Sequence, residues 1–203
     1  MNRVRTGPLL AIGTAAGCVI AAVVSGVRLE GYSHLAHPLA LPGARQLGAA
    51  GLLFGLFAFV LPGLVQAWQA WRLRDALPAA GGRIAGIGLQ LLLLAALAFA
   101  AQGLLPLDLE SLDSGASRWH ALAWLVWALA FPLGALLAAA GSWRRPGRRP
   151  AAGMLLAAGV LVACGAFLGN GAVAPLLQRV AVLAWLLWGA YAALRTPLSR
   201  GAA

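Results

Sequence analysis

Three histidines and a few acids are the side chains of this sequence that are best suited to chemistry, and they fall in two stretches. His34 and His37 are three residues apart, so on a helical turn they would share a face. In the second stretch, Asp108 precedes His120. Three imidazoles and a carboxylate are ligands of an open zinc site, in which the metal turns a bound water into a nucleophile. One hypothesis is therefore a zinc site held by His34, His37 and His120.

A serine nucleophile is the second chemical hypothesis, because Ser33 stands next to His34 and an adjacent imidazole can serve as the base. The candidate catalytic residues are then Asp108, His120 and Ser33. The chain has no GxSxG elbow, no HExxH pair and no glycine-rich phosphate loop. Both enzymatic hypotheses rest on residue types and clustering, without a recognised motif.

A structural role for the same residues is the alternative. Arg179 lies beside apolar sequence, where a guanidinium is costly unless it is paired or reaches the membrane interface. We expect a carboxylate partner for Arg179, with Asp108 as the first candidate, since ion pairs can fix the register of helices. This interpretation predicts one polar cluster at one end of a helical bundle, made of His34, His37, Asp108, His120, Gln178 and Arg179.

Six apolar segments must position these residues. Of 203 residues, 62% are hydrophobic and 10% are charged, and the mean hydropathy is +0.85. Soluble domains carry about 25% charged residues, so this chain is predicted to lie in a membrane. The segments cover about 8–28, 47–70, 84–105, 119–141, 151–170 and 177–195, each near the ~20 residues that cross a bilayer. We predict a single all-α domain, 1–203, which is a polytopic transmembrane bundle of six helices.

The arginines between the segments predict its orientation. One set of connections holds eleven of the fifteen, and these are Arg3, Arg5, Arg72, Arg74, Arg83, Arg144, Arg145, Arg148, Arg149, Arg195 and Arg200. The other set holds Arg28, Arg45, Arg118 and Arg179. Short loops rich in arginine stay in the cytoplasm. Both termini are therefore predicted to be cytoplasmic, and the polar cluster to be external. The net charge of +10 lies in these connections and on no single polar face, which argues against nucleic-acid binding.

Several residues inside the segments predict local geometry. Pro62 and Pro132 should kink their helices. Gly51 and Gly55 form a small-xxx-small pattern, which favours close helix contacts. The two cysteines, Cys18 and Cys164, have no metal-ligand spacing and are interpreted as small buried residues.

Two tryptophan pairs lie deep in the predicted spans, each with a spacing of three. Trp124 and Trp127 form one pair, and Trp185 and Trp188 form the other. Packing between helices is the preferred interpretation, and an aromatic cleft for a lipid or cofactor is the alternative. Gln90 is the amide side chain that would line a transport path if there were one.

Three stretches of the sequence carry a family resemblance. They are His37-Pro-Leu-Ala-Leu-Pro-Gly-Ala-Arg-Gln-Leu-Gly48, then Gly103-Leu-Leu-Pro-Leu-Asp108 with the later His120, and Leu177-Gln-Arg179 with Trp185 or Trp188 and Arg195 beyond. They resemble, in this order, the His-x-Ile-Ser-x-Leu-Gly stretch, the Phe-Pro-x-Asp and His element and the start of the last span in a bacterial and archaeal family of six-helix membrane proteins known as domain of unknown function 998. Leu105 stands where the family often has an aromatic. The resemblance implies a six-helix fold and no particular activity, and it points to His37, Asp108, His120, Gln178 and Arg179.

Three functional hypotheses follow for a multi-pass protein of the bacterial cytoplasmic membrane. The first is a non-enzymatic bundle that handles lipids or small molecules, or that is a subunit of a membrane assembly. The second is a metal-dependent hydrolase with a periplasm-facing histidine and aspartate site and zinc as its cofactor. The third, a small transporter, is the least favoured because the centres of the spans carry essentially no charge. Membrane lipids and other membrane subunits are the expected partners.

Overall fold

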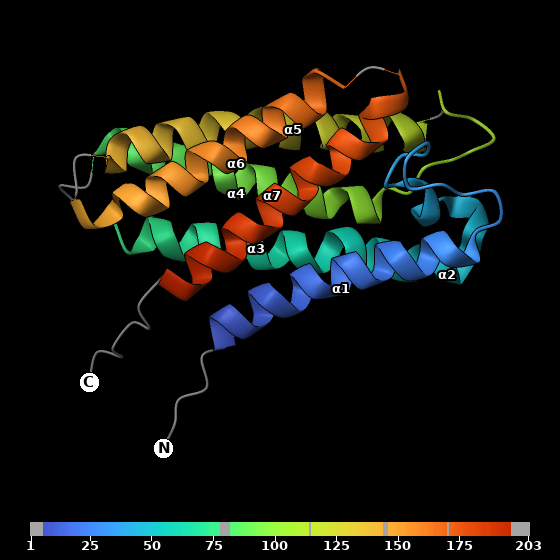
Figure 1. Cartoon of the computed structure of the whole chain (residues 1–203), viewed down its shortest axis with the longest axis horizontal. Coiled ribbons are helices and arrows are strands. Elements are labelled where there is room, and N and C mark those ends of the chain that lie inside the picture. The colour runs from blue at the N-terminus through green and yellow to red at the C-terminus, as the bar shows by residue number, and fades with distance from the viewer. Residues whose placement is uncertain (1–5, 78–81, 114, 144–145, 170, 196–203) are drawn as a thin grey trace.

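The computed structural model describes residues 6–77, 82–113, 115–143, 146–169 and 171–195, and in them it contains helices and no strand. Six helical stretches are long and apolar enough to cross a membrane, which confirms the predicted all-α bundle. Five of them are single helices: α1 (Thr6–Arg28), α4 (Arg83–Leu104), α5 (Gly115–Ser142), α6 (Arg149–Phe167) and α7 (Ala174–Arg195). Figure 1 shows them side by side along the long axis of the molecule.

The second spanning stretch, Arg45–Asp75, is built from four consecutive pieces. A 3-10 turn η2 (Arg45–Leu47) leads into α2 (Gly48–Gly55), a π-helical segment η3 (Leu56–Val60) follows, and α3 (Leu61–Asp75) completes the span. Further 3-10 turns are η1 (Leu41–Gly43), η4 (Pro146–Arg148) and η5 (Gly171–Val173).

Pro62 explains why the π-helical segment occurs where it does. A proline has no N–H for the carbonyl four residues earlier, which here is that of Ala58. The Cys18 thiol of α1 donates a hydrogen bond to this carbonyl oxygen, with an S···O distance of 3.4 Å. The predicted disturbance at Pro62 is thus a local widening of the helix, and Cys18 is a buried hydrogen-bond donor as well as a small packing residue.

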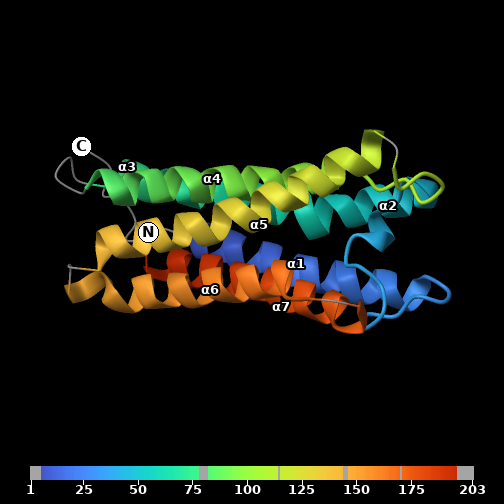
Figure 2. The ribbon, with the colours of Figure 1, turned by 90° about the horizontal axis from the view of Figure 1, so that it is seen from above.

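Helices that follow one another in the chain pack against one another, and α1 completes the arrangement by contacting α3 and α7. Seen from above in Figure 2, α3 and α4 form one layer and α1, α6 and α7 form the other, while α5 crosses obliquely between them. The first residue of α1 and the last of α7 lie at the same end of the bundle (Figure 1).

The arginines are sorted between the two ends of this bundle. We call one end the Arg28 end, which carries Arg28, Arg45, Arg118 and Arg179, and the other the Arg195 end, which carries Arg72, Arg74, Arg83, Arg148, Arg149 and Arg195. The remaining arginines of the orientation argument lie outside the described residues, namely Arg3, Arg5, Arg144, Arg145 and Arg200.

Small residues allow close approaches between the spans. A Cβ added at Gly55 would lie 2.8 Å from the backbone oxygen of Gly103 in α4, so α2 and α4 touch through their backbones. Gly51, the other member of the small-xxx-small pattern, faces the oxygen of Ala44 in the loop before its own helix. Of the predicted pair, only Gly55 therefore serves a contact between spans.

Aromatic side chains fill the centre of the bundle. Trp127 of α5 and Trp185 of α7 are 0% and 1% exposed, and their ring centroids are 6.0 Å apart. Phe99 of α4 packs against both rings, with its centroid 4.2 Å from Trp185 and 5.4 Å from Trp127. Trp188 of α7 likewise contacts Phe131 of α5 at 5.8 Å, whereas Trp124 is half-buried and contacts Trp127 of its own helix. The interpretation as contacts between helices thus agrees with Trp127, Trp185 and Trp188.

Candidate functional site

Asp108 lies at the Arg28 end, in the connection between α4 and α5, where its carboxylate accepts two hydrogen bonds. Its Oδ1 accepts a hydrogen bond of 2.6 Å from Gln46 Nε2 and one of 3.2 Å from the backbone N–H of Glu110. Its own N–H donates to Ser117 Oγ over 3.0 Å. The hydrogen bond from Gln46, more than any other interaction, lowers the pKa of this carboxyl below its ordinary value.

The same residues join two loops that are distant in sequence. Gln46 Oε1 accepts a hydrogen bond from the N–H of Leu109, so one amide side chain contacts the Asp108 loop twice. The N–H of Arg45 donates to the oxygen of Leu107 over 2.8 Å. The Arg45 guanidinium lies 3.7 Å from Asp108 Oδ2, but this side chain is 67% exposed, so the ion pair adds little. We call Arg45, Gln46, Asp108 and Ser117 the Asp108 network. Its hydrogen bonds hold the two loops together, which is a structural role.

Arg179 does not pair with Asp108, and our expectation of that pair is wrong. Its Nη2 donates a 2.6 Å hydrogen bond to the hydroxyl of Tyr32, and its Nη1 donates to the oxygen of Pro175 over 2.8 Å. The carboxylate of Asp108 lies instead beside Arg45. Burial raises the pKa of Tyr32, and the nearby guanidinium opposes that effect. The two terminal nitrogens of the guanidinium are thus paired with a phenol and a carbonyl, whereas its buried Nε has no hydrogen-bond partner among the described residues.

The two loop histidines pack around this phenol. The rings of Tyr32 and His34 meet edge to face at 5.1 Å, and His37 stacks on Tyr32 at 5.6 Å. His37 Nδ1 accepts a hydrogen bond from the backbone N–H of Ser33, whose hydroxyl accepts one from the N–H of Leu35. The contact between Ser33 and His37 is therefore made by the backbone. We call Tyr32, His34, His37 and Arg179 the Tyr32 network.

His120 is buried and contacts neither loop histidine. Its Nδ1 lies 2.9 Å from the oxygen of Leu105 and 3.2 Å from that of Gln102, so this nitrogen carries the proton because carbonyls only accept. Within the described ranges, no group of three histidine, cysteine or acidic side chains could hold a metal ion. The zinc hypothesis for His34, His37 and His120 has no geometric support.

The predicted single cluster is therefore two networks with different partners. Gln178 is half-buried at the start of α7, and in the described part of the chain its side chain makes no hydrogen bond. Gln90, the residue named for a transport path, is exposed on the outside of α4.

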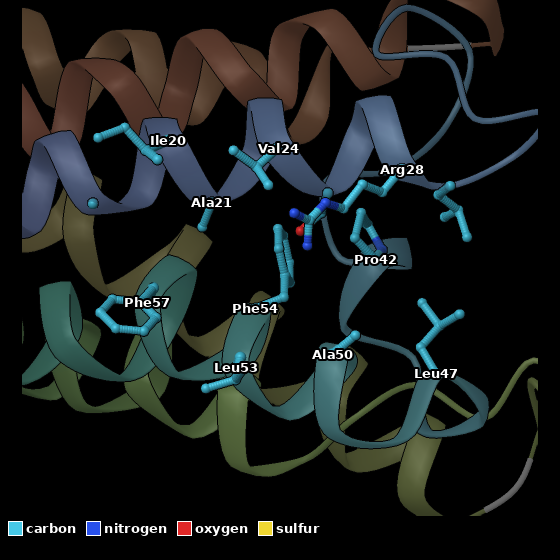
Figure 3. Close-up of a pocket in the computed structure, with 13 residues that line it drawn as sticks. Ile20, Ala21, Val24, Arg28, Pro42, Leu47, Ala50, Leu53, Phe54 and Phe57 are labelled. Carbon is cyan, nitrogen blue, oxygen red and sulfur yellow. The ribbon is translucent and has the colours of Figure 1, made fainter.

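A groove lies between α1 and the second span at the Arg28 end. Its cavity has a volume of about 570 Å³, within the range of roughly 300–1,000 Å³ that is usual for small-molecule sites. One wall is α1 from Gly17 to Arg28, and the other is formed by the turn at Pro42 and by residues 47–57. Figure 3 shows side chains from both walls facing the same space, among them Ile20, Val24, Leu53, Phe54 and Phe57.

The groove is apolar along its length and polar at its mouth. Of the side chains that line it, only Ser25 and Arg28 are polar, and both lie in the last turn and a half of α1. From Gly17 to Arg28 the helix rises eleven residues, roughly 16 Å, which is about half of the ~30 Å hydrocarbon thickness. The groove therefore has the depth of one leaflet.

Arg28 has no partner within the part of the chain that the structure describes: no hydrogen bond or ion pair engages its guanidinium. In Figure 3 the side chain runs from α1 into the groove. Sequence reasoning assigned Arg28 only a role in orientation and missed the groove. The signal in the sequence that could have indicated this site is that Arg28 ends an apolar helix and has no acidic residue one helical turn away.

Three buried glutamines were also missed, although polar residues within spans are an accepted indicator of function. Gln66 and Gln69 of α3 and Gln102 of α4 are 5%, 6% and 2% exposed. Gln66 Nε2 donates to the oxygen of Trp185 in α7 over 3.2 Å, so this amide links two spans. Among the residues that the structure describes, neither side-chain polar atom of Gln69 or of Gln102 has a hydrogen-bond partner.

Comparison with known proteins assigns no family to this fold or to these sites. No family model, no curated protein and no solved structure matches the chain. The resemblance to domain of unknown function 998 stays a prediction.

Proposed function

We propose that this chain is a non-enzymatic lipid-handling protein of the bacterial cytoplasmic membrane, and that the groove between α1 and the second span holds an acyl chain. The observation that carries the proposal is the depth of the groove, which is about the thickness of one leaflet. The groove is apolar, about 570 Å³ in volume and open at its side, and it runs from the middle of α1 to its last residue. A hydrocarbon chain is the ligand class that needs no polar partner along such a wall.

The orientation that we propose places both termini in the cytoplasm and the Arg28 end outside. Its support is the excess of eleven arginines over four between the two sets of connections. The groove then opens toward the external leaflet. Membership in the family of domain of unknown function 998 is part of this proposal, and the six-helix arrangement agrees with what that resemblance implies.

The hydrolase alternative has less support. The Asp108 carboxylate is engaged by an amide, a backbone N–H and a guanidinium, and His120 Nδ1 by two carbonyls. Neither group faces the groove. A reaction would require these side chains to be presented to a substrate, and in this arrangement they hold loops together.

Filling the groove tests the proposal. Ala50 is exposed and lines the groove, whereas the adjacent Ala49 is exposed and does not, so Ala50→Trp and Ala49→Trp are a matched pair. Each variant is purified in detergent and washed extensively, and the lipid that it retains is extracted and quantified by mass spectrometry. We expect about one retained lipid per chain for the unchanged protein and for Ala49→Trp, and a large loss for Ala50→Trp.

Two outcomes would contradict the proposal: no retained lipid on the unchanged protein, or equal retention by both tryptophan variants. Circular dichroism and gel filtration of each sample confirm that the bundle is folded, so a loss of lipid in Ala50→Trp reports on the groove itself.

A further inference from the structure

The mouth of the groove carries a positive charge that the protein leaves uncompensated. Arg28 is the one charged side chain among those that line the groove, and within the described residues it has no hydrogen bond and no ion pair. Glu30 lies two residues further along, but it is exposed and does not line the cavity. An anion that enters the mouth would therefore meet an unpaired guanidinium.

The other arginines at this end are differently placed. Arg45 lies beside Asp108, and Arg179 is bonded to Tyr32 and to the oxygen of Pro175. Among the described arginines, Arg28 alone combines a guanidinium without a partner and a position on the groove wall. A guanidinium is weakly hydrated and binds phosphate oxygens through two parallel N–H donors, which makes it the side chain best suited to a phosphate at a membrane interface.

The distances along α1 match the shape of a phospholipid. Ser25, whose hydroxyl is a further donor, precedes Arg28 by three residues and lies on the same face of the helix. Below them the wall is apolar from Val24 to Gly17, a rise of roughly 10 Å. A headgroup phosphate at Arg28 would thus place its acyl chain against Val24 and Ile20, toward Gly17.

We infer that the groove selects a phospholipid with a net negative headgroup, and that Arg28 is the residue that binds its phosphate. This inference rests on the proposed function and goes beyond it, since a groove that merely holds a chain would accept neutral and anionic lipids alike. An arginine near the membrane surface favours anionic lipid by about 1 kcal/mol, which corresponds to a roughly fivefold preference.

A competition between headgroups tests the inference. The full chain is reconstituted into vesicles of equal parts phosphatidylglycerol and phosphatidylcholine with identical acyl chains, then extracted in mild detergent and washed. The retained lipids are counted by mass spectrometry. We expect roughly five phosphatidylglycerol molecules for each phosphatidylcholine on the unchanged protein, a ratio near one for Arg28→Gln, and an intermediate ratio for Arg28→Lys, which keeps the charge but loses the planar fork.

Arg118→Gln is the matched control, because Arg118 is an exposed arginine at the same end of the bundle and outside the groove. It should keep the full preference. An equal loss in Arg118→Gln would overturn the inference, because general surface charge would then explain the ratio. So would an unchanged ratio in Arg28→Gln.

The two proposals fail in distinguishable ways. If the unchanged protein retains no lipid, the groove is not a lipid site and the proposed function is wrong. If it retains lipid that Ala50→Trp excludes, but with equal amounts of the two headgroups, the proposed function stands and the role of Arg28 is wrong. Added salt gives a further check, because the preference should weaken as the Debye length shrinks from about 10 Å at 0.1 M to 3 Å at 1 M.

Discussion

The side-chain amide of Gln66 in α3 lies in a notch that Gly189 leaves in α7. A Cβ at Gly189 would overlap the amide of Gln66, and the same amide donates a hydrogen bond to the oxygen of Trp185, one turn earlier in α7. The glycine and the glutamine therefore form one interlocking contact between two spans near the aromatic centre. Amide hydrogen bonds between membrane helices add to packing because lipid offers no competing partner.

Gly189→Ala should destabilise the bundle, because the new methyl group and the Gln66 amide cannot occupy the same space. Overpacking of this kind costs about 1 to 3 kcal/mol in the free energy of unfolding. Denaturation of the protein in mixed micelles, followed by circular dichroism, measures the change. Gly153→Ala is the control, since nothing lies within 4 Å of a Cβ there, and it should be neutral or slightly stabilising.

The double variant Gln66→Ala with Gly189→Ala tests whether the destabilisation comes from the contact between these two residues or from any larger side chain at this position of α7. Removing the amide makes room for the methyl group, so the double variant should be less destabilised than the sum of the two single changes. Strict additivity would show that the two residues do not share this space.

Tyr32→Phe should destabilise the Arg28 end because it removes the acceptor of the 2.6 Å hydrogen bond from Arg179 Nη2. Hydrogen bonds to charged groups contribute about 1.5 to 3 kcal/mol, so a loss of that order in unfolding free energy is expected. Tyr191→Phe is the comparison, since the Tyr191 ring contacts Arg195 through its face and the hydroxyl is not required for that contact. Equal effects of the two changes would remove the special role of Tyr32.

Acid should weaken the Asp108 network. The pKa of Asp108 is lowered in the folded protein, chiefly by the hydrogen bond from Gln46, so the carboxylate stabilises the fold above the ordinary pKa of 3.8. That contribution is lost as the pH falls through the lowered value. The stability difference between the unchanged protein and Asp108→Asn should therefore be largest near neutral pH and shrink below about pH 4. A pH-independent difference for Asp108→Asn would contradict the prediction.

The proposed orientation predicts which loops face the outside of the cell. Leu112→Cys and Ala76→Cys place thiols at exposed positions at opposite ends of the bundle, in a background without Cys18 and Cys164. In intact cells, a membrane-impermeant maleimide should label Leu112→Cys and spare Ala76→Cys until the membrane is opened. The reverse pattern would place the groove in the cytoplasmic leaflet.

The spans could be predicted from the sequence because a backbone in hydrocarbon must satisfy its own hydrogen bonds, which an apolar segment of this length does by forming a helix. The expected segments agree with the helices to within a few residues, from 8–28 against Thr6–Arg28 to 177–195 against Ala174–Arg195. The tryptophan pairs were also interpretable, since a spacing of three places two rings on one helix face.

The contacts between loops were not predictable in the same way. The expected ion pair between Arg179 and Asp108 is wrong because several arginines and acids at the Arg28 end could form pairs. Which of them pair depends on how the turns fold. Here the 3-10 turn at Arg45 brings Gln46 onto the Asp108 loop, which leaves Tyr32 for Arg179. The groove was missed for a related reason: it depends on how far α1 stands from α2, which no pattern within either helix encodes.

The thiol of Cys18 ties α1 to the second span next to the inner end of the groove. Gly17, at the inner end of the cavity, lies 3.9 Å from the ring of Phe57 when a Cβ is placed on it, and the next residue, Cys18, bonds to the Ala58 carbonyl that Pro62 cannot serve. The two walls are therefore joined where the cavity ends, halfway along α1. If the groove does hold an acyl chain as proposed, that chain would enter and leave from the same side of the bilayer and would be given no route across it.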